Sequence, residues 1–307
     1  MISFLLIAGG LVILYFGAEI LVKGSVAMAE HLGINSLAIG LTVVAFGTSA
    51  PELTVSAYSA MKDAGDIAVA NVVGSNIFNI AFILGLSAII CPVNISISLI
   101  KKDIPAMLIF TTLAIYFLSN RFLSRLEGCL LLTLAIIYTI YTLRQSRLQT
   151  KPDPTPTSKP KKMYYSGGYV LSGLILLAIG SKMLITGSID LAQSLGISQT
   201  LIGLTIVSAG TSLPELATSV IAAWKRQPDI AVGNIIGSNI FNILGILGIS
   251  SILSPLRFPD LASQDLIMLA LMSLLALPLM RSNFEFSRLE GSLMLTLYAF
   301  YLYLLWP

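Results

Sequence analysis

Two glutamates, Glu52 and Glu215, lie near the middle of long apolar segments, where a charged side chain is costly. On insertion scales, a carboxylate at the centre of a membrane span costs about 2.5–3.5 kcal/mol. Each glutamate ends the same kind of motif, GTSAPE at Gly47–Glu52 and GTSLPE at Gly210–Glu215. The proline of the motif also interrupts the backbone hydrogen bonds of a helix at that depth. Because both costs occur twice, we expect the two glutamates to hold something of opposite charge.

Oxygen-bearing groups accompany each glutamate at helical spacing. In the first copy, Ala45, Thr48 and Ser49 precede Glu52 by seven, four and three positions, so they share one helical face. The glycine and proline of the motif predict an unwound turn that directs backbone carbonyls, including that of Thr48, into a cavity. Further polar side chains continue the first copy and repeat in the second: Asn71, Ser75 and Asn79, then Ser208, Thr211, Ser212, Asn234, Ser238 and Asn242.

This set of candidate ligands contains oxygen only, with no nitrogen or sulfur. Calcium takes about six to eight oxygens in a flexible cage, whereas magnesium prefers to keep several waters. Two carboxylates neutralise one divalent cation, and when they are ionised and empty they repel each other. The pattern therefore predicts a site that holds cations or protons at every stage of a cycle.

Some of these polar and small residues also have simpler interpretations. Asn79 and Asn242 could serve as polar contacts between helices, and Ser56 and Ser219 could bond only to their own preceding turn. Four glycines of the same segments are typical of close helix packing: Gly40, Gly74, Gly203 and Gly237.

The composition places the motifs in a membrane. Of the 307 residues, 56% are hydrophobic and 11% are charged, whereas soluble domains have about 25% charged residues. The net charge of +3 gives no indication of nucleic-acid binding, and Cys91 and Cys129 fit no metal-site or disulfide spacing. Apolar runs long enough to cross about 30 Å of hydrocarbon recur along the chain. They predict spans at 3–22, 36–61, 67–91, 104–120, 126–144, 167–187, 200–224, 230–254, 264–280 and 288–306.

An internal repeat organises these spans. An offset of 163 positions relates Glu52 to Glu215 and, in one register without insertion, many glycines, prolines and asparagines on either side. Each copy holds five predicted spans, an odd number, so the second copy enters the membrane in the opposite orientation. We predict an all-α membrane protein with ten transmembrane helices in two inverted five-helix repeats, 1–144 and 167–307, joined by a proline-rich linker at 145–166. Inverted repeats are typical of transporters, with the site at the middle of the membrane.

The distribution of basic residues predicts the orientation. With the linker in the cytoplasm, thirteen of the 18 Lys and Arg residues lie on the cytoplasmic side. This excess places both termini outside.

Two more motifs, both GSNIFN, follow at Gly74–Asn79 and Gly237–Asn242. With GTSAPE and GTSLPE, they closely resemble the two α-repeats of the calcium/cation antiporter superfamily, specifically its sodium/calcium exchangers, over essentially the whole chain. The resemblance implies calcium shared by Glu52, Glu215 and the carbonyls of Thr48 and Thr211. It also implies flanking sodium sites, with two asparagines at the central position: Ala45, Ser49 and Ser75 on one side, Ser208, Ser212 and Ser238 on the other, and Asn79 and Asn242 between them.

The resemblance further implies a secondary antiporter, not an enzyme, that extrudes calcium as sodium enters and needs no cofactor beyond the transported Ca²⁺ and Na⁺. In the resembled family, the first and sixth helices slide across the other eight, and we expect the Gly17/Gly180 and Gly24/Gly187 pairs at such sliding contacts. The chain lacks the large regulatory insert of animal exchangers. It therefore looks like a prokaryotic member of the plasma (inner) membrane, surrounded by lipid, and a monomer is compatible with the sequence.

One departure bears on the coupling ion. Potassium-dependent exchangers resemble each other in having aspartate at the end of the second Gly-Ser motif, whereas this chain has Asn79 and Asn242. The difference argues against a potassium site and leaves no third acid in the core. A calcium/proton or potassium-dependent antiporter of the same fold is the nearest alternative. A cation channel is less favoured because tight multidentate binding slows conduction, and no nucleophile–base pair indicates an enzyme.

Overall fold

The computed structural model describes residues 2–149, 163–195 and 208–305 of the chain. The centre of the predicted linker and the first eight positions of the predicted seventh span, 200–207, lie outside these residues. In the described part, six helices are long and apolar enough to cross a membrane, and a seventh span is a helix pair bent by 48°.

The first half contains five helical segments, several of them divided, and two short strands. Its elements are α1 (Ile2–Leu32), α2 (Ser36–Ile39), η1 (Gly40–Val44), α3 (Ala45–Thr48), α4 (Ala50–Met61), α5 (Gly65–Ile77), η2 (Phe78–Ile83), α6 (Leu84–Ile90), β1 (Val93–Asn94), η3 (Leu99–Asp103), α7 (Ile104–Leu118), β2 (Phe122–Leu123) and α8 (Arg125–Gln149). The η segments are π-helical turns within longer helices.

The second half repeats this order. Its elements are α9 (Met163–Ser194), α11 (Ser208–Gly210), α12 (Leu213–Trp224), α13 (Pro228–Phe241), η5 (Asn242–Ile246), α14 (Leu247–Leu253), β3 (Leu256–Arg257), α15 (Ser263–Arg281), β4 (Glu285–Phe286) and α16 (Arg288–Leu305). The helices therefore follow the predicted spans closely. The main differences are that α1 and α9 are longer than predicted, and that 145–149 and 163–166, which we included in the linker, are helical.

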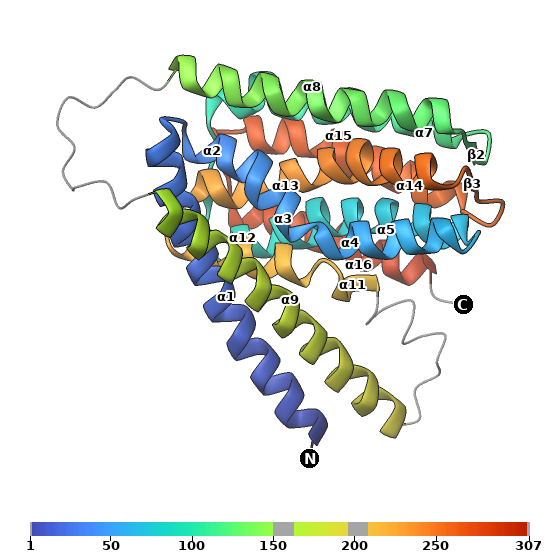
Figure 1. Ribbon diagram of the computed structural model, residues 1–307, viewed down its shortest axis with the longest axis horizontal. Helices are drawn as coiled ribbons and strands as arrows, with labels where there is room; N and C mark the ends of the chain where they lie inside the picture. Colours follow the sequence, from blue (N-terminus) through green and yellow to red (C-terminus); the bar gives the residue numbers. More distant parts are fainter. Residues whose placement is uncertain (1, 150–162, 196–207, 306–307) are drawn as a thin grey trace.

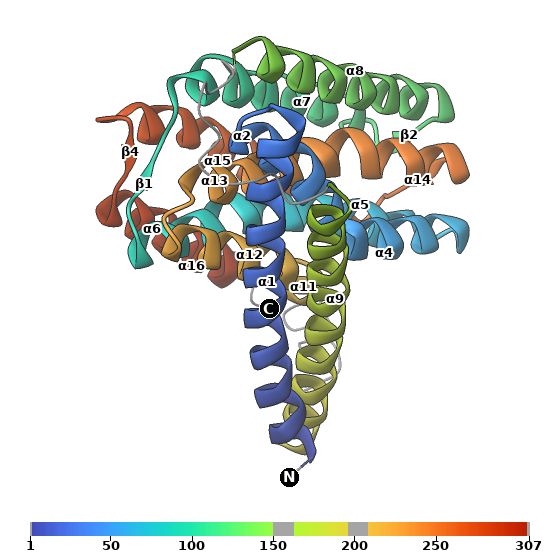
Figure 2. The same cartoon turned by 60° about the vertical axis from the view of Figure 1, so that its left-hand side comes forward.

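Helices α1 and α9 form a pair that lies across the other helices and projects beyond them (Figures 1 and 2). The pair is antiparallel and packed backbone to backbone. A Cβ added at Gly17 would lie 3.0 Å from the Leu177 nitrogen, and one added at Gly180 would lie 2.9 Å from the Leu14 nitrogen. Small residues allow this approach in a membrane, where close packing replaces the hydrophobic effect between helices.

This packing corrects one prediction. We expected Gly17, Gly24, Gly180 and Gly187 at sliding contacts with the rest of the bundle. They lie instead between α1 and α9, where each glycine approaches the backbone of the other helix of the pair. The physical reason is that the glycines recur every seven residues on one face of each helix, which suits one continuous, tight contact.

The two halves are interlocked by their short strands. Strand β1 of the first half pairs with β4 of the second, and β2 pairs with β3, both antiparallel. Arg121 adds bonds from the first half to the Leu261 carbonyl and, at 2.8 Å, to the Ser263 hydroxyl. The repeat unit of the sequence is therefore not an independently closed structural unit.

The register of 163 fails locally at the fourth helix of each half. Asp103 accepts a hydrogen bond from Tyr138 at 3.0 Å, and Asp265 accepts one from Tyr301 at 2.8 Å. The tyrosines are 163 positions apart, but the aspartates are 162 apart. The π-helical turn η3 accommodates one extra residue before Asp103. The insertion-free alignment predicted from the sequence is thus wrong by one residue at this point.

Candidate cation site

The site is built around a break in each of two helices. In the first half, α3 ends at Thr48, Ser49 has a turn conformation (φ −80°, ψ 9°) and α4 begins at Ala50. In the second half, Ser212 has nearly the same conformation (φ −87°, ψ 9°) before α12 begins. Proline occupies the second position of each new helix and has no N–H to donate to the preceding turn. The predicted interruption is therefore present in both copies, and it is centred on the serine.

The breaks bring the two glutamates of the opposite halves together. The Ser212 hydroxyl donates to Glu52 Oε1 at 2.8 Å, and the Ser49 hydroxyl donates to Glu215 Oε1 at 2.8 Å. Both carboxylates are fully buried, and each is bonded to the serine that lies three positions before the other glutamate. Each half thus supplies the hydroxyl that faces the carboxylate of the other half.

Two asparagines, Asn71 and Asn234, form an asparagine layer that bonds to residues around the glutamates. The sequence pattern groups both with the candidate ligands. Asn234 donates to the Glu215 carbonyl at 3.3 Å and to Ser219 Oγ at 2.9 Å, and it accepts a bond from the Thr48 hydroxyl at 3.0 Å. Asn71 repeats the two donations on its own half, to the Glu52 carbonyl at 3.2 Å and to a serine. The matching bond from Thr211 to Asn71 is longer, at 3.5 Å. Their repetition at offset 163 with the glutamates was the available signal.

Several buried oxygens of the predicted ligand set have no hydrogen-bond partner among the residues that the structure describes. They are Oε2 of Glu52 and Glu215, Oγ of Ser75 and Ser238, and Oδ1 of Asn79 and Asn242. All six residues are at most 3% exposed. Buried polar atoms without a partner are uncommon in proteins, and an ion or water is the usual explanation. The set fits the oxygen-only chemistry of a hard cation.

The asparagines of this set lie in π-helical turns, which the sequence pattern does not predict. Asn79 lies in η2 and Asn242 begins η5, at equivalent positions of the two halves. A π-helical turn holds one extra residue and is frequent at functional sites. No simple periodicity announces such a turn, because the flanking helix continues with ordinary apolar residues.

Two further residues of the predicted site, Ala45 and Ser208, are described to different extents by the structure. Ala45 is buried, and its carbonyl accepts bonds from the Thr48 hydroxyl at 3.3 Å and the Ser49 N–H at 3.0 Å. Ser208 begins α11, but its side chain lies outside what the structure describes. Within the described ranges no three His, Cys, Asp or Glu side chains cluster as a metal site.

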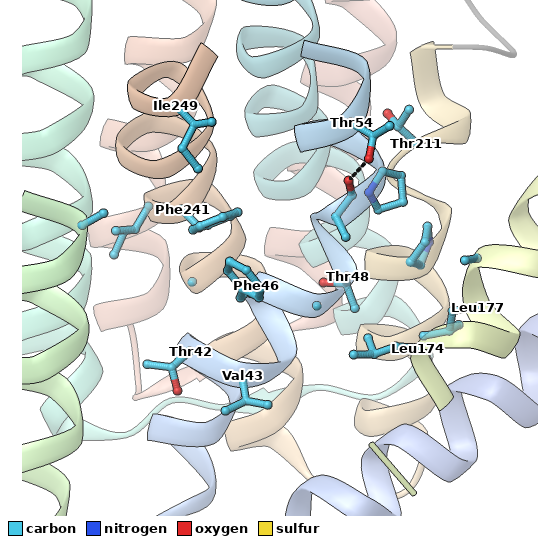
Figure 3. Close-up of a pocket in the computed structure, with 18 of the residues that line it drawn as sticks. Thr42, Val43, Phe46, Thr48, Thr54, Leu174, Leu177, Thr211, Phe241 and Ile249 are labelled. Atoms are coloured by element: carbon cyan, nitrogen blue, oxygen red, sulfur yellow. Dashed lines mark hydrogen bonds between the residues drawn. The ribbon is translucent and has the colours of Figure 1, made fainter. Parts of the chain in front are cut away.

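An apolar cavity of about 1150 Å³ reaches the helix breaks from one side (Figure 3). Phe46 and Phe241 meet in it with ring centroids 4.9 Å apart, and Leu174 and Leu177 of α9 lie across from them. Thr48 and Thr211 are the members of the predicted cation site that line it. Helix α9 covers both breaks, since a Cβ at Gly47 or Gly210 would meet Leu174 or Ile185 at 2.5–2.6 Å.

Known proteins are similar to this chain over most of its length. The structure aligns with a solved structure of the sodium-calcium exchanger NCX_Mj, soaked with 2.5 mM Na⁺ and 0.1 mM Ca²⁺, at a TM-score of 0.85 and 35% identity, covering 98% of this chain and 97% of that one. The sodium/calcium exchanger MaX1 of Methanosarcina acetivorans is 34% identical over 345 residues, 99% of this chain and 98% of its own length. The inner membrane protein YrbG of Escherichia coli is 34% identical over 275 residues, 87% and 85% of the two chains.

The sequence profile of the sodium/calcium exchanger protein family matches residues 2–144 and 165–306, which include both helix breaks and both glutamates. The matched regions correspond to the two halves described above. The protein is accordingly a transporter of cations and not an enzyme, and Ca²⁺ and Na⁺ are the substrates of this class. This chain belongs to the sodium/calcium exchanger family.

Proposed function

We propose that the protein is a secondary antiporter that exchanges Na⁺ for Ca²⁺, extruding Ca²⁺ as Na⁺ enters. The observation that carries this proposal is the pair of buried carboxylates, Glu52 and Glu215, each bonded to a serine of the opposite half. In the described part of the chain, each also has one oxygen without a partner. The two negative charges are balanced by one Ca²⁺ or by two Na⁺. Competition of the two ions for the same oxygens couples their movements.

The proposed ligands follow the symmetry of the site. Calcium would be held between Glu52 and Glu215, with the carbonyls of Thr48 and Thr211. Sodium would use the flanking oxygens of each half, with Asn79 and Asn242 at the centre: Ala45, Ser49 and Ser75, and Ser208, Ser212 and Ser238. The unpartnered oxygens of Ser75 and Ser238 support this assignment.

The α1–α9 pair supplies the moving part. In the structure α1 packs along α12, whereas the cavity separates α9 from the equivalent helix α4. The two contacts are related by the inverted repeat. Exchange of one contact for the other converts this conformer into one whose cavity faces the opposite side of the membrane. This exchange is the basis of alternating access in inverted-repeat transporters.

The proposed arrangement in the cell is a multi-pass protein of a prokaryotic inner membrane with both termini outside. The repeats are 1–144 and 167–307, and the connection between α8 and α9 is cytoplasmic. The excess of Lys and Arg on that side supports this orientation.

The decisive experiment uses purified protein in proteoliposomes. Vesicles loaded with Na⁺ and diluted into Na⁺-free medium should accumulate ⁴⁵Ca²⁺, whereas an inside-acid pH gradient without Na⁺ should not drive uptake. Omission of K⁺ should leave the rate unchanged. Uptake driven by protons alone would overturn the assignment of Na⁺ and support the calcium/proton alternative.

A potassium-dependent exchanger of the same fold is a second candidate, and one feature weighs against it. The central positions are Asn79 and Asn242, and neither adds a charge to the two carboxylates for a further cation.

Saturation of Ca²⁺ uptake at slow turnover would argue against a channel.

A further inference from the structure

The two equivalent docking contacts of the moving pair carry different residues. Where α1 meets α12, Glu19 forms an ion pair with Lys225, and the rings of Tyr15 and Trp224 lie 6.2 Å apart. Tyr15 and Glu19 are four residues apart and therefore share one face of α1. Hydrogen bonding to Glu19 raises the pKa of the Lys225 ammonium.

The equivalent faces of α9 and α4, which the cavity separates, carry residues that cannot form these interactions. At offset 163, Tyr15 and Trp224 correspond to Ala178 and Met61, and the ion pair corresponds to two lysines, Lys182 and Lys62. Ala178 and Lys182 line the open cavity on the α9 side. Lys62 lies at the end of α4, with its Nζ 5.8 Å from the ring of Tyr58.

The inverted repeat predicts where these charges lie in the reciprocal conformer, the one in which α9 instead of α1 is docked. When α9 docks on α4 and α1 leaves α12, Glu19 parts from Lys225, and Lys182 approaches Lys62. An attraction is replaced by a repulsion of like charges, and an aromatic pair by Ala178 and Met61.

Resting on the proposed function, we propose that Glu19 and Lys225, with Tyr15 and Trp224, are positioning residues that latch α1 onto α12. They bias the exchanger toward the conformer described here, and Lys182 opposes the reciprocal one. The ion pair is about one-third exposed on each side. Each charge change is therefore expected to shift the ratio of conformers about two- to fivefold, as for other solvent-exposed pairs.

A pair of cysteines reports on the reciprocal conformer while leaving the latch intact. Ala178→Cys and Met61→Cys, in a background that lacks the native cysteines, replace the equivalents of Tyr15 and Trp224. A short bis-maleimide, which adds one cysteine thiol across each of its two double bonds, should join them only when α9 docks on α4. The rate of crosslinking in proteoliposomes measures how often that conformer forms.

In this reporter, Glu19→Gln should raise the crosslinking rate about two- to fivefold. Lys182→Gln should also raise it, and Lys182→Glu should raise it further because it can pair with Lys62. Glu30→Gln, at an exposed glutamate near the end of α1, is the matched control and should leave the rate unchanged. High salt should reduce the effects, since exposed charges are screened.

Double reversal separates the ion pair from a general effect on folding. Glu19→Lys combined with Lys225→Glu should restore the parent rate, whereas Glu19→Lys alone should give the largest increase of the α1 variants. A second reporter, Tyr15→Cys with Trp224→Cys, should respond to Lys182→Glu in the opposite direction. Crosslinking rates that do not change on substitution of Glu19 or Lys182 in either reporter would overturn the latch.

Sodium-driven ⁴⁵Ca²⁺ uptake by the uncrosslinked reporter distinguishes this inference from the proposed function. Charge-dependent crosslinking without sodium-driven uptake would leave the latch standing and remove the assignment of the ions. Normal uptake with crosslinking that does not depend on these charges would overturn the latch and leave the assignment of the ions standing.

Discussion

At the scale of single residues, the site depends on contacts that cross between the halves. Ser49 faces Glu215 and Ser212 faces Glu52, so neither half contains a complete set of its own. A buried carboxylate needs either a cation or several hydrogen bonds to remain charged. The serine supplies one bond to each glutamate, and the second oxygen of each, which has no partner among the described residues, is the one that we propose to hold an ion.

Neutralising either glutamate should therefore stop exchange. Glu52→Gln or Glu215→Gln removes one of the two charges that balance Ca²⁺, and sodium-driven ⁴⁵Ca²⁺ uptake should fall at least about 100-fold, equivalent to about 2.7 kcal/mol. Glu30→Gln, which changes an exposed glutamate of α1, should retain the parent rate. Substantial uptake by either buried variant would rule out a shared carboxylate cage.

The asparagine layer makes a separate prediction. Asn234→Ala removes bonds to the Glu215 carbonyl, Ser219 and Thr48 inside a buried region, and each buried partner left unsatisfied costs about 1–3 kcal/mol. The thermal unfolding temperature in detergent and the transport rate should both fall. Asn94→Ala, at an exposed position in β1, should change neither, and an Asn234→Ala protein of normal stability and rate would contradict the bridging role.

At the scale of elements, glycines let the backbones of α1 and α9 touch. Gly10, Gly17 and Gly24 recur every seven residues on α1, and Gly173, Gly180 and Gly187 do so on α9. A pair packed this closely is expected to keep its internal contact while it changes its contact with the other helices.

A side chain placed in this seam should force the two helices apart. Gly180→Val would put a Cβ 2.9–3.0 Å from Leu14 and Gly10, so overpacking should cost about 1–3 kcal/mol. We expect a lower unfolding temperature and slower exchange. Gly168→Val is the matched change on α9, because no atom lies within 4 Å of its added Cβ, and it should be nearly neutral. Equal effects of the two substitutions would contradict the tight seam.

At the scale of the whole molecule, the halves are joined by more than the chain between them. The strand pairs β1–β4 and β2–β3 cross from one half to the other, and Asp66 accepts a bond from the Asp260 N–H at 2.9 Å. The long seam between α1 and α9 adds to these contacts. Together they form an extensive interface between the repeats.

Separate expression of the halves tests this interface. Co-expressed 1–149 and 163–307 should copurify through a tag on one fragment and regain sodium-driven Ca²⁺ uptake. Either fragment alone should aggregate or be degraded, because its strands, its seam helix and its single glutamate lack their partners. Stable, monodisperse fragments that fail to associate would contradict the interlocked arrangement.

The sequence by itself determined the helical membrane class, the duplicated halves, the helix breaks and the candidate ligands. Each of these is a local or periodic property: apolar length, a repeat offset, a proline, or oxygens three and four residues apart. It also indicated the family, through motifs such as GTSAPE that lie within single segments. These properties do not depend on how the segments dock.

Only the tertiary structure decided which groups meet. The Ser49–Glu215 contact, the Thr48–Asn234 bond, the crossed strands and the glycine seam all join residues more than 100 positions apart, and their geometry depends on the docking of two inverted copies. The π-helical turns at Asn79 and Asn242 and the one-residue slip at Asp103 were equally invisible, because an extra residue in one turn leaves the apolar pattern of the span nearly unchanged.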